Sequence, residues 1–351
     1  MSAFDPTEVR FIIMTILMVV LLLLSSSFET CFCAREGNHL KVDSENTTPS
    51  KFNKKVKENG GSRRKLSKFM GSTYTRSIPD ETMAANSATF NVLDFGAKGD
   101  GHTDDTKAFE ATWAAACKME ASTMVVPSGS VFFLGPITFS GPNCQPNIVF
   151  QLDGKIIAPT SSGAWGSGLL QWLDFSQLKG ITVKGKGIID GQGSVWWNDS
   201  PTYNPTDDST VSDSKNTALR FYGSNGVTVT GITIQNSPQT HLKFDDCTNV
   251  QVSDFTASSP GVSPNTDGIH LQNSQDVLIY GSTLACGDDC VSIQTGCSNV
   301  YIHNVNCGPG HGISIGSLGK DNLKACVSNI TVRDVTMHNT LTGVRIKTWQ
   351  V

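Results

Sequence analysis

The sequence of 351 residues contains no hydrophobic run long enough to cross a bilayer comfortably. Its longest run covers residues 11–24 and is interrupted only by Thr15. A run of this length followed by small polar residues is typical of the core of a signal peptide. Cys31 and Cys33 supply the small residues expected just before a cleavage site. We therefore expect residues 1–33 to be a signal peptide, with secretion and no stable membrane association after cleavage. An uncleaved signal anchor is the alternative, because Asp5 and Glu8 weaken the positive charge expected before the run.

Positive charge is scarce in the main part of the chain. The whole sequence has a net charge of −4 at pH 7. Residues 35–89 hold an excess of five positive charges and residues 1–34 an excess of two negative charges, which leaves −7 for residues 90–351. An acidic domain argues against nucleic acid as a partner. Residues 34–89 also contain few large apolar side chains, so they are expected to form a basic, disordered extension or pro-segment.

The glycine-rich segment 96–101 (GAKGDG) lacks the lysine and the spacing of a phosphate-binding loop, which argues against a nucleotide site. Residues 90–95 alternate as in a strand. Thr103 or Asp104 can cap a helix over residues 105–121, where apolar side chains recur at helical spacing. One amphipathic helix ahead of a long β region would cover the open end of a stacked sheet.

Cysteines are few but even in number once the signal peptide is removed. A cut after residue 33 leaves eight of the ten, which is typical of an oxidised, secreted domain. Three glycosylation acceptors agree with export: Asn46, Asn198 and Asn329.

From residue 124 onward one short template recurs in the sequence. It consists of apolar-x-apolar, two residues that usually include Gly, Asp or Asn, and a second apolar-x-apolar. Its first apolar positions are separated by 23, 27, 23 and 30 residues and are Val227, Val250, Val277, Val300 and Ile330. Ile181 lies 46 residues before Val227, which we interpret as two periods of 23.

These repeats favour a parallel β-helix, an all-β solenoid in which each period forms one coil. Two-residue alternation buries one face of each strand, and the period is too short for a strand-helix-strand unit. Each repeat must then bury its apolar face against its neighbours, with successive coils about 4.8 Å apart. A β-sandwich is the alternative, although its hairpin signals would recur more closely.

Polar motifs recur at the same interval within this region. They are NTDG at 265–268, GDDC at 287–290 and GHG at 310–312. Stacked coils would therefore place Asp267, the pair Asp288 and Asp289, and His311 in one column. Arg345 and Lys347 lie two apart on one face of a strand about one coil further on. Because Asp288 and Asp289 are adjacent, a turn or bulge must present both.

Three crowded carboxylates beside an imidazole suit glycoside hydrolysis. Repulsion should raise the pKa of one carboxyl group, which then holds a proton, while a less crowded partner stays ionised. Such a pair can protonate a leaving oxygen and activate water, with an acidic pH optimum. Arg345 and Lys347 suggest a substrate that bears carboxylates. The glycines on both sides of His311 would let a ligand approach closely.

Taken together, NTDGIH at 265–270, GDDC, GHG and RIK at 345–347 resemble the four-motif signature of the polygalacturonases, glycoside hydrolase family 28. The resemblance extends over residues 90–351. It implies a right-handed parallel β-helix and hydrolysis of α-1,4-linked galacturonan, with inversion, in the plant cell wall. It implies no metal or other cofactor and a monomer.

The resemblance also implies a role for each motif residue. Asp288 would be the general acid, while Asp267 and Asp289 activate water. His311 would support protonation of the site. The remaining roles are substrate binding by Arg345 and Lys347 and a disulfide between Cys290 and Cys307.

Family members continue well beyond the RIK motif, whereas Val351 follows it by four residues. We therefore expect the C-terminal coils to be missing, so that the last coil exposes apolar surface. Cys286 is expected to interfere with pairing of Cys290. Two rival functions follow: a catalytically impaired, pectin-binding fragment, and a β-helix pectate lyase that would use the aspartates to bind calcium.

Overall fold

The computed structural model describes residues 88–161, 171–197 and 217–349. The predicted signal peptide and nearly all of the predicted basic extension lie outside these residues, as do Asn46 and Asn198. Within the described ranges, no helix has the length and apolar character needed to span a membrane.

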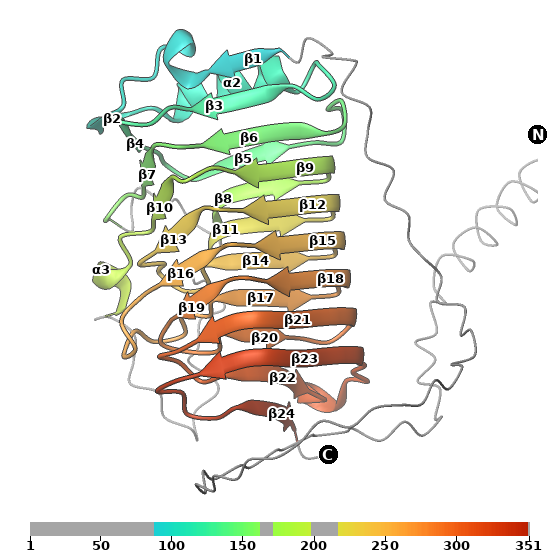
Figure 1. The fold of residues 1–351 in the computed structure, drawn as a ribbon. Helices are drawn as coiled ribbons and strands as arrows, with labels where there is room; N and C mark the ends of the chain where they lie inside the picture. Colours follow the sequence, from blue (N-terminus) through green and yellow to red (C-terminus); the bar gives the residue numbers. More distant parts are fainter. Residues whose placement is uncertain (1–87, 162–170, 198–216, 350–351) are drawn as a thin grey trace, which may run out of the picture. The chain divides into compact units, whose positions relative to one another are not determined.

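The described chain winds into a right-handed parallel β-helix, as predicted (Figure 1). Each coil contributes strands to three ladders, and the strand pairs within each ladder are parallel. The first two ladders join into one sheet, because the long strands β21 (Ser298–Cys307) and β23 (Ser328–Met337) belong to both. The third ladder forms a separate sheet of eight strands.

The strands fall into these ladders in chain order. Before the two long strands, the first ladder contains β1 (Thr89–Asn91), β3 (Thr123–Val126), β6 (Ile148–Leu152), β9 (Lys179–Lys184), β12 (Asn225–Thr230), β15 (Thr248–Ser253) and β18 (Gln275–Tyr280). The second contains β2 (Asp100–Asp104), β4 (Val131–Phe133), β7 (Lys155–Ile157), β10 (Ile188–Asp190), β13 (Thr233–Gln235), β16 (Thr256–Ser258) and β19 (Thr283–Ala285). The third contains β5 (Ile137–Ser140), β8 (Gln171–Ser176), β11 (Thr217–Tyr222), β14 (Leu242–Asp245), β17 (Ile269–Gln272), β20 (Val291–Ile293), β22 (Ile313–Leu318) and β24 (Val344–Thr348).

The repeat positions identified in the sequence are partners in the first ladder. Val227 pairs with Val250, Val250 with Val277, Val277 with Val300, and Val300 with Ile330. The apolar period therefore corresponds to one coil, as predicted.

The interpretation of residues 181–227 as two periods is wrong. Ile181 pairs directly with Val227, so the 46 residues between them form a single enlarged coil. This coil contains β10, the short helix α3 (Ser194–Trp197) and β11, and it includes residues 198–216, which are not described. An insertion in one coil lengthens the sequence period without changing the register of the strands around it.

The polar residues of the template form the bends between strands. Between the first and second ladders, Asp254, Asn304 and Asp334 all adopt positive φ, between 50° and 52°. Gly231 and Gly281 occupy the equivalent bends with φ of 78° and 61°. Glycine, asparagine and aspartate tolerate this left-handed conformation best, which explains why these residue types recur between the apolar segments.

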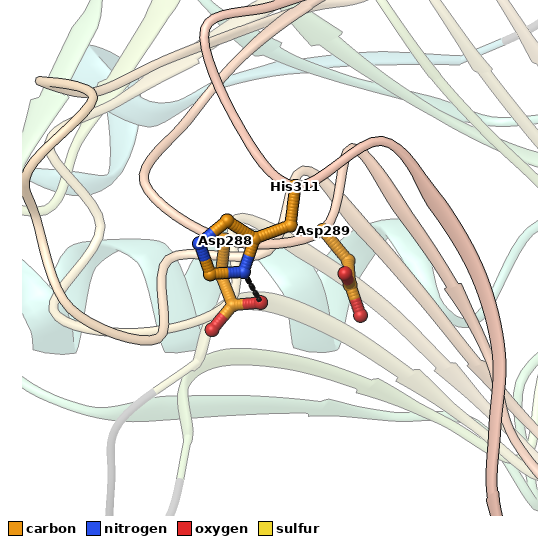
Figure 2. A group of neighbouring side chains, drawn as sticks. All are labelled: Asp288, Asp289 and His311. Atoms are coloured by element: carbon orange, nitrogen blue, oxygen red, sulfur yellow. Dashed lines mark hydrogen bonds and ion pairs between the residues drawn. The ribbon is translucent and has the colours of Figure 1, made fainter. Parts of the chain in front are cut away.

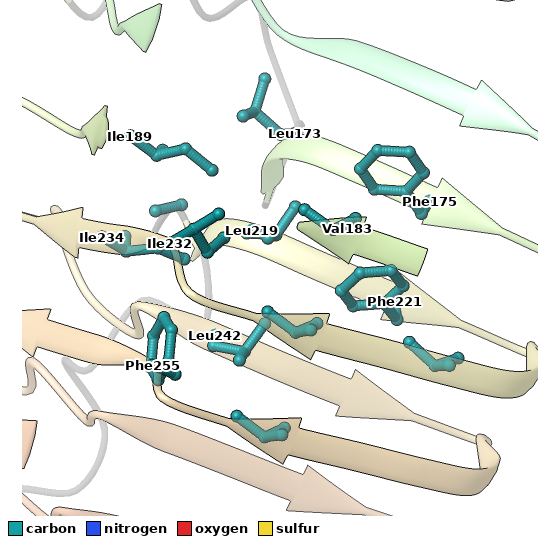
Figure 3. Close-up of a cluster of buried hydrophobic side chains, with 14 of the residues drawn as sticks. Leu173, Phe175, Val183, Ile189, Leu219, Phe221, Ile232, Ile234, Leu242 and Phe255 are labelled. Atoms are coloured by element: carbon teal, nitrogen blue, oxygen red, sulfur yellow. The ribbon is translucent and has the colours of Figure 1, made fainter. Parts of the chain in front are cut away.

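The interior is a continuous apolar core in which equivalent side chains stack from coil to coil (Figure 3). Phe175, Phe221 and Phe244 are register partners in the third ladder, and their rings stack with centroids 5.3 Å apart. Leu271 and Ile293 continue the same row. Stacking of identical faces fixes the register of the sheet that carries the polar motifs on its outer side.

Helix α2 (Thr106–Ala116) caps the N-terminal end of the stack, as predicted (Figure 1). It buries Phe109 and Trp113, whose rings contact Phe132 and Phe139 of the first coils. The predicted limits of the helix need correction. The backbone nitrogen of Thr106 donates a 3.0 Å hydrogen bond to Asp104, one of the two predicted caps, and the helix ends at Ala116, before residue 121.

The predicted strand over residues 90–95 is also shorter than expected. Strand β1 ends at Asn91, and Val92–Phe95 form a 3-10 turn, η1. The Asn91 side chain accepts a 3.0 Å hydrogen bond from the Leu93 nitrogen, which starts this turn. Local side-chain capping therefore overrides the alternating pattern here.

The last described coil exposes apolar side chains, as predicted. Val344 is 53% and Ile346 60% exposed, although their register partners Ile313 and Ile315 point into the core. The 3-10 turn η3 (Lys320–Asn322) precedes this coil. The predicted glycosylation acceptor Asn329 is exposed, and its side-chain nitrogen donates a 2.8 Å hydrogen bond to Asn299.

Candidate active site

Three successive coils bring the predicted residues to one edge of the third ladder. Asp267, Asp289 and His311 each lie two residues before a strand, namely β17, β20 and β22. The first residues of these strands are register partners, so the three positions repeat one coil apart. The column predicted from the motif spacing is therefore present in the fold.

Asp288 and His311 form a close pair. His311 Nδ1 lies 2.9 Å from Asp288 Oδ1, and both side chains are partly exposed, at 35% and 19% (Figure 2). The hydrogen bond with Asp288 raises the pKa of His311 although partial burial opposes this, and the negative charges of Asp288 and Asp289 add to the rise. Below that pKa the imidazolium donates to Asp288 Oδ1, so the pair holds a proton at a partly exposed position.

Asp289 points away from this pair, into a buried set of donors (Figure 2). Asp288 and Asp289 lie in the irregular segment between β19 and β20, which presents the two side chains in different directions, as the sequence required. Asp289 Oδ1 accepts hydrogen bonds from Ser314 Oγ at 2.6 Å and from Arg345 at 2.7 Å. Asp289 Oδ2 accepts one from Lys347 Nζ at 2.8 Å.

These donors decide the charge of Asp289. Its side chain is only 2% exposed, and burial alone would raise its pKa. The hydrogen bonds from Lys347 and Ser314, the charge of Lys347 and the hydrogen bond from Arg345 outweigh burial and hold the pKa of Asp289 below its usual value. Asp289 is therefore ionised at neutral and mildly acidic pH.

Arg345 and Lys347 were predicted to bind the substrate. In the structure both cations contact Asp289, and Arg345 Nε also donates to Ser314 at 2.7 Å. The two residues thus share one strand face, as expected, with a protein carboxylate already between them. Their contact with a substrate remains a prediction.

Asp267 has the opposite electrostatic behaviour to Asp289. His270 Nδ1 lies 2.9 Å from its Oδ2 atom, and both side chains are mostly buried. Burial raises the pKa of Asp267 to about 6 against the effect of the His270 hydrogen bond, and the charge of Asp288 adds to the rise. Two of the three aspartates therefore have pKa values displaced in opposite directions. The raised pKa belongs to Asp267, which was predicted to be a base, and burial rather than repulsion is its main cause.

Several supporting residues were not identified from the sequence. His241 is fully buried, and its ring contacts the Asp267 carbonyl oxygen at 2.7 Å through Nδ1 and Ser259 Oγ at 2.8 Å through Nε2. Burial lowers the pKa of His241 to about 4, so it is neutral. The Thr266 hydroxyl accepts a 2.8 Å hydrogen bond from the Gly287 nitrogen and ties two of the loops together.

A sequence signal existed for some of these supports. His270 lies within the NTDGIH motif, three residues after Asp267, and Ser314 lies three residues after His311 in the GHGIS segment. His241 has no comparable signal, because its role depends on burial beneath a loop from the next coil.

The glycines around His311 serve the protein backbone. A Cβ atom on Gly312 would lie 2.2 Å from the Thr342 carbonyl oxygen, and one on Gly310 would lie 2.8 Å from the Asp288 carbonyl oxygen. Close packing of adjacent coils therefore explains these glycines, and the close approach of a ligand stays a prediction.

The disulfide implied by the resemblance is present. Cys290 and Cys307 are bonded, and Cys286 remains a buried thiol near them without interfering. A second disulfide joins Cys117, at the end of α2, to Cys144. Cys247 and Cys297 are also buried thiols, so the even number of cysteines does not mean that all of them pair.

Asp288, Asp289 and His311 place three potential metal ligands within 4.8 Å of one another. Calcium takes about six to eight oxygen ligands. This group offers only two carboxylates and an imidazole, and Asp289 already accepts hydrogen bonds from Arg345, Lys347 and Ser314. The donor set therefore fits calcium poorly, which disfavours the lyase alternative.

Comparison with known proteins agrees with this geometry. The family model for glycosyl hydrolases family 28 matches residues 117–351. A polygalacturonase of Prunus persica is 45% identical over 76% of this chain and 66% of its own length. A polygalacturonase of Chamaecyparis obtusa is 43% identical over 74% of this chain and 50% of its own length. The chain thus spans about half the length of some curated relatives.

Solved structures support the same fold. An endo-xylogalacturonan hydrolase from Aspergillus tubingensis aligns with a TM-score of 0.65 at 28% identity, over 75% of this chain and 68% of its own. A polygalacturonase from Erwinia carotovora aligns with a TM-score of 0.60 at 23% identity, over 78% and 75% of the two chains, which concerns the fold alone. From the family match, the motifs and the β-helix, we conclude that this chain belongs to glycosyl hydrolases family 28.

Proposed function

We propose that the protein hydrolyses α-1,4-galacturonosyl linkages of pectin by acid/base catalysis with inversion. Its family and its polygalacturonase relatives supply the substrate class. The observation that carries the reaction type is the partly exposed Asp288–His311 pair, 2.9 Å apart, beside the two buried aspartates Asp267 and Asp289. Such an arrangement places a group that can supply a proton next to carboxylates that can activate water.

In this proposal Asp288 is the general acid. It is the most accessible of the three aspartates, at 19% side-chain exposure, and His311 contacts it directly. The Asp288–His311 pair holds one proton below the raised pKa of His311. His311 passes this proton to Asp288, which delivers it to the leaving glycosidic oxygen.

Asp267 and Asp289 activate the water that attacks the sugar. Asp289 is kept ionised by Arg345 and Lys347 and supplies a permanent negative charge. Asp267 accepts the proton of water once it is itself ionised. Arg345 and Lys347 each expose about a quarter to a third of the side chain and can also contact a substrate carboxylate.

Product analysis on polygalacturonate tests this proposal. We expect new reducing ends, no ultraviolet-absorbing unsaturated products and full activity in the presence of a calcium chelator. Proton NMR of the first products should show the anomer opposite to that of the substrate linkage. Unsaturated products lost on chelation would support the lyase instead. Tight binding to pectate without new reducing ends would support the impaired, binding-only fragment.

The pH profile of kcat/KM is expected to be bell-shaped, with its maximum on the mildly acidic side. Asp267 must be ionised to act as a base, so activity falls as the pH drops below about 6. His311 must keep its proton, so activity falls again above its raised pKa, which exceeds the ordinary value of 6.5. Initial rates between pH 4 and 9 check both limbs. Activity that still rises beyond pH 8 would contradict this assignment.

We also propose that the protein is secreted, acts as a monomer in the plant cell wall and needs no cofactor. Support comes from the hydrophobic run at residues 11–24 and from the disulfides Cys117–Cys144 and Cys290–Cys307, which suit an oxidising compartment.

A further inference from the structure

A polar cavity of about 400 Å³ lies on the outer face of the third ladder, beside Asp267 and His270. It does not include Asp288, Asp289 or His311. Its remaining walls consist of four glutamines, three threonines, Arg220 and Lys243. A cavity lined by polar and charged residues suits a hydroxyl-rich, charged ligand rather than an apolar one.

Arg220 and Lys243 occupy successive coils next to the catalytic column. Arg220 is the register partner of Lys243, and Lys243 is the register partner of His270. The same row continues through Ser292 and Ser314 to Arg345. The aspartates therefore lie between two basic pairs, and four coil steps of about 4.8 Å separate Lys243 from Arg345 by roughly 19 Å.

The two basic pairs differ in how firmly a protein carboxylate holds the lysine of each pair. Lys347 Nζ lies 2.8 Å from Asp289 in a full hydrogen bond. Lys243 Nζ lies 3.4 Å from Asp245 Oδ1, and that oxygen has no hydrogen-bond partner within the described parts of the chain. The Lys243 ammonium group thus lies at the cavity, and Asp245 Oδ1 does not accept a hydrogen bond from it.

Arg220 is fixed in place but keeps donors available. Its Nε atom lies 2.5 Å from Asp245 Oδ2, and its guanidinium group lies 4.7 Å from the centre of the Tyr222 ring. Its NH1 atom is 3.9 Å from Asp174, which is beyond hydrogen-bonding distance. Asp174 is buried, and burial raises its pKa to about 6, so it gives Arg220 little compensation in acidic solution.

We propose that Arg220 and Lys243 form a second carboxylate-binding site, which holds an acidic sugar one or two coils away from Asp267, opposite Arg345 and Lys347. This inference rests on the proposed function and specifies it further. A single acidic sugar cannot reach both basic pairs, so the groove favours a chain of several acidic sugars. Methyl-esterification at this subsite would remove the charge that Lys243 recognises.

The test compares Lys243→Gln with the parent protein for affinity and cleavage of polygalacturonate. We expect Kd to rise about tenfold, which corresponds to about 1.4 kcal/mol, with a larger change in KM than in kcat. Arg220→Gln should act in the same direction. The loss should shrink for galacturonate oligomers too short to span the two basic pairs, and Lys243→Arg should restore most of the affinity.

Lys155→Gln is the matched control. Lys155 forms an ion pair with Asp190 at 2.9 Å in the second ladder. Lys155→Gln therefore removes a similar lysine–aspartate ion pair that does not line the cavity. Unchanged affinity in folded Lys243→Gln, with a parent protein that cleaves polygalacturonate, would overturn this inference and leave the proposed function intact. A parent protein that neither binds nor cleaves polygalacturonate would overturn both.

Discussion

Asp288→Asn is expected to reduce kcat on polygalacturonate by about 10³-fold or more, since general acid catalysis contributes roughly 10²–10⁴ and no neighbouring group is placed to replace it. Asparagine keeps the shape of the side chain and can still form a hydrogen bond with His311, which now lies 2.9 Å away. The partly exposed site needs no rearrangement. Tm and far-ultraviolet circular dichroism should therefore match those of the parent protein.

Asp334→Asn provides the control for this substitution. Asp334 is an exposed bend residue with φ of 51°, a conformation that asparagine adopts equally well. This control should retain full activity. If Asp288→Asn keeps more than about a tenth of the parental kcat, a loss smaller than general acid catalysis provides, Asp288 is not the general acid.

The sequence allowed most of the fold to be predicted because the physical determinants are local and repeated. Val227, Val250, Val277 and Val300 mark one inward-facing row, and asparagine, aspartate or glycine marks the bends. The enlarged coil after Ile181 escaped prediction because its length happens to equal two periods. Pairing of strands across an insertion depends on the surrounding ladder, which spacing alone does not reveal.

The position of the candidate site followed from the same periodicity, whereas its ion pairs did not. Motifs one coil apart must stack, so Asp267, Asp289 and His311 had to lie near one another. The pairing of Asp289 with Arg345 and Lys347 depends on side-chain direction in an irregular loop. His241 and Lys243 act through contacts between coils, and neither belongs to a motif that the sequence made conspicuous.

The two buried aspartates show how the fold divides one chemical task. The Asp289 carboxylate accepts three hydrogen bonds and stays negatively charged. The Asp267 side chain accepts one, and its pKa lies closer to neutral pH. The difference arises because Ser314, Arg345 and Lys347 come from the two coils that follow Asp289, on the side away from Asp267. The position of each aspartate along the column therefore decides its protonation.

Asp267→Asn is expected to lower kcat by about 10²-fold or more, the contribution typical of a general base, and at the same time to make the protein more stable at neutral pH. The folded-state pKa of Asp267 is about 6, against an ordinary value of 3.8. A carboxyl group whose pKa is raised by folding does not lower the free energy of unfolding at a pH where it is protonated in both the folded and the unfolded protein. The cost appears as the pH rises from about 4 and is complete above about 6.

A displacement of about two pKa units corresponds to about 3 kcal/mol, an upper estimate because Asp267 keeps some solvent contact. Asparagine carries no charge and can still accept the hydrogen bond from His270, so the variant avoids this cost. Its Tm should exceed that of the parent by several degrees at pH 7.5, since about 1 kcal/mol shifts Tm by roughly 2–4 °C in domains of comparable size. The two proteins should unfold at nearly the same temperature at pH 4. Asp276→Asn, at an exposed position near the start of β18 with φ of 56°, is the control and should change neither activity nor this pH dependence. A Tm difference that is equal at pH 4 and pH 7.5 would show that the gain does not come from the buried charge of Asp267.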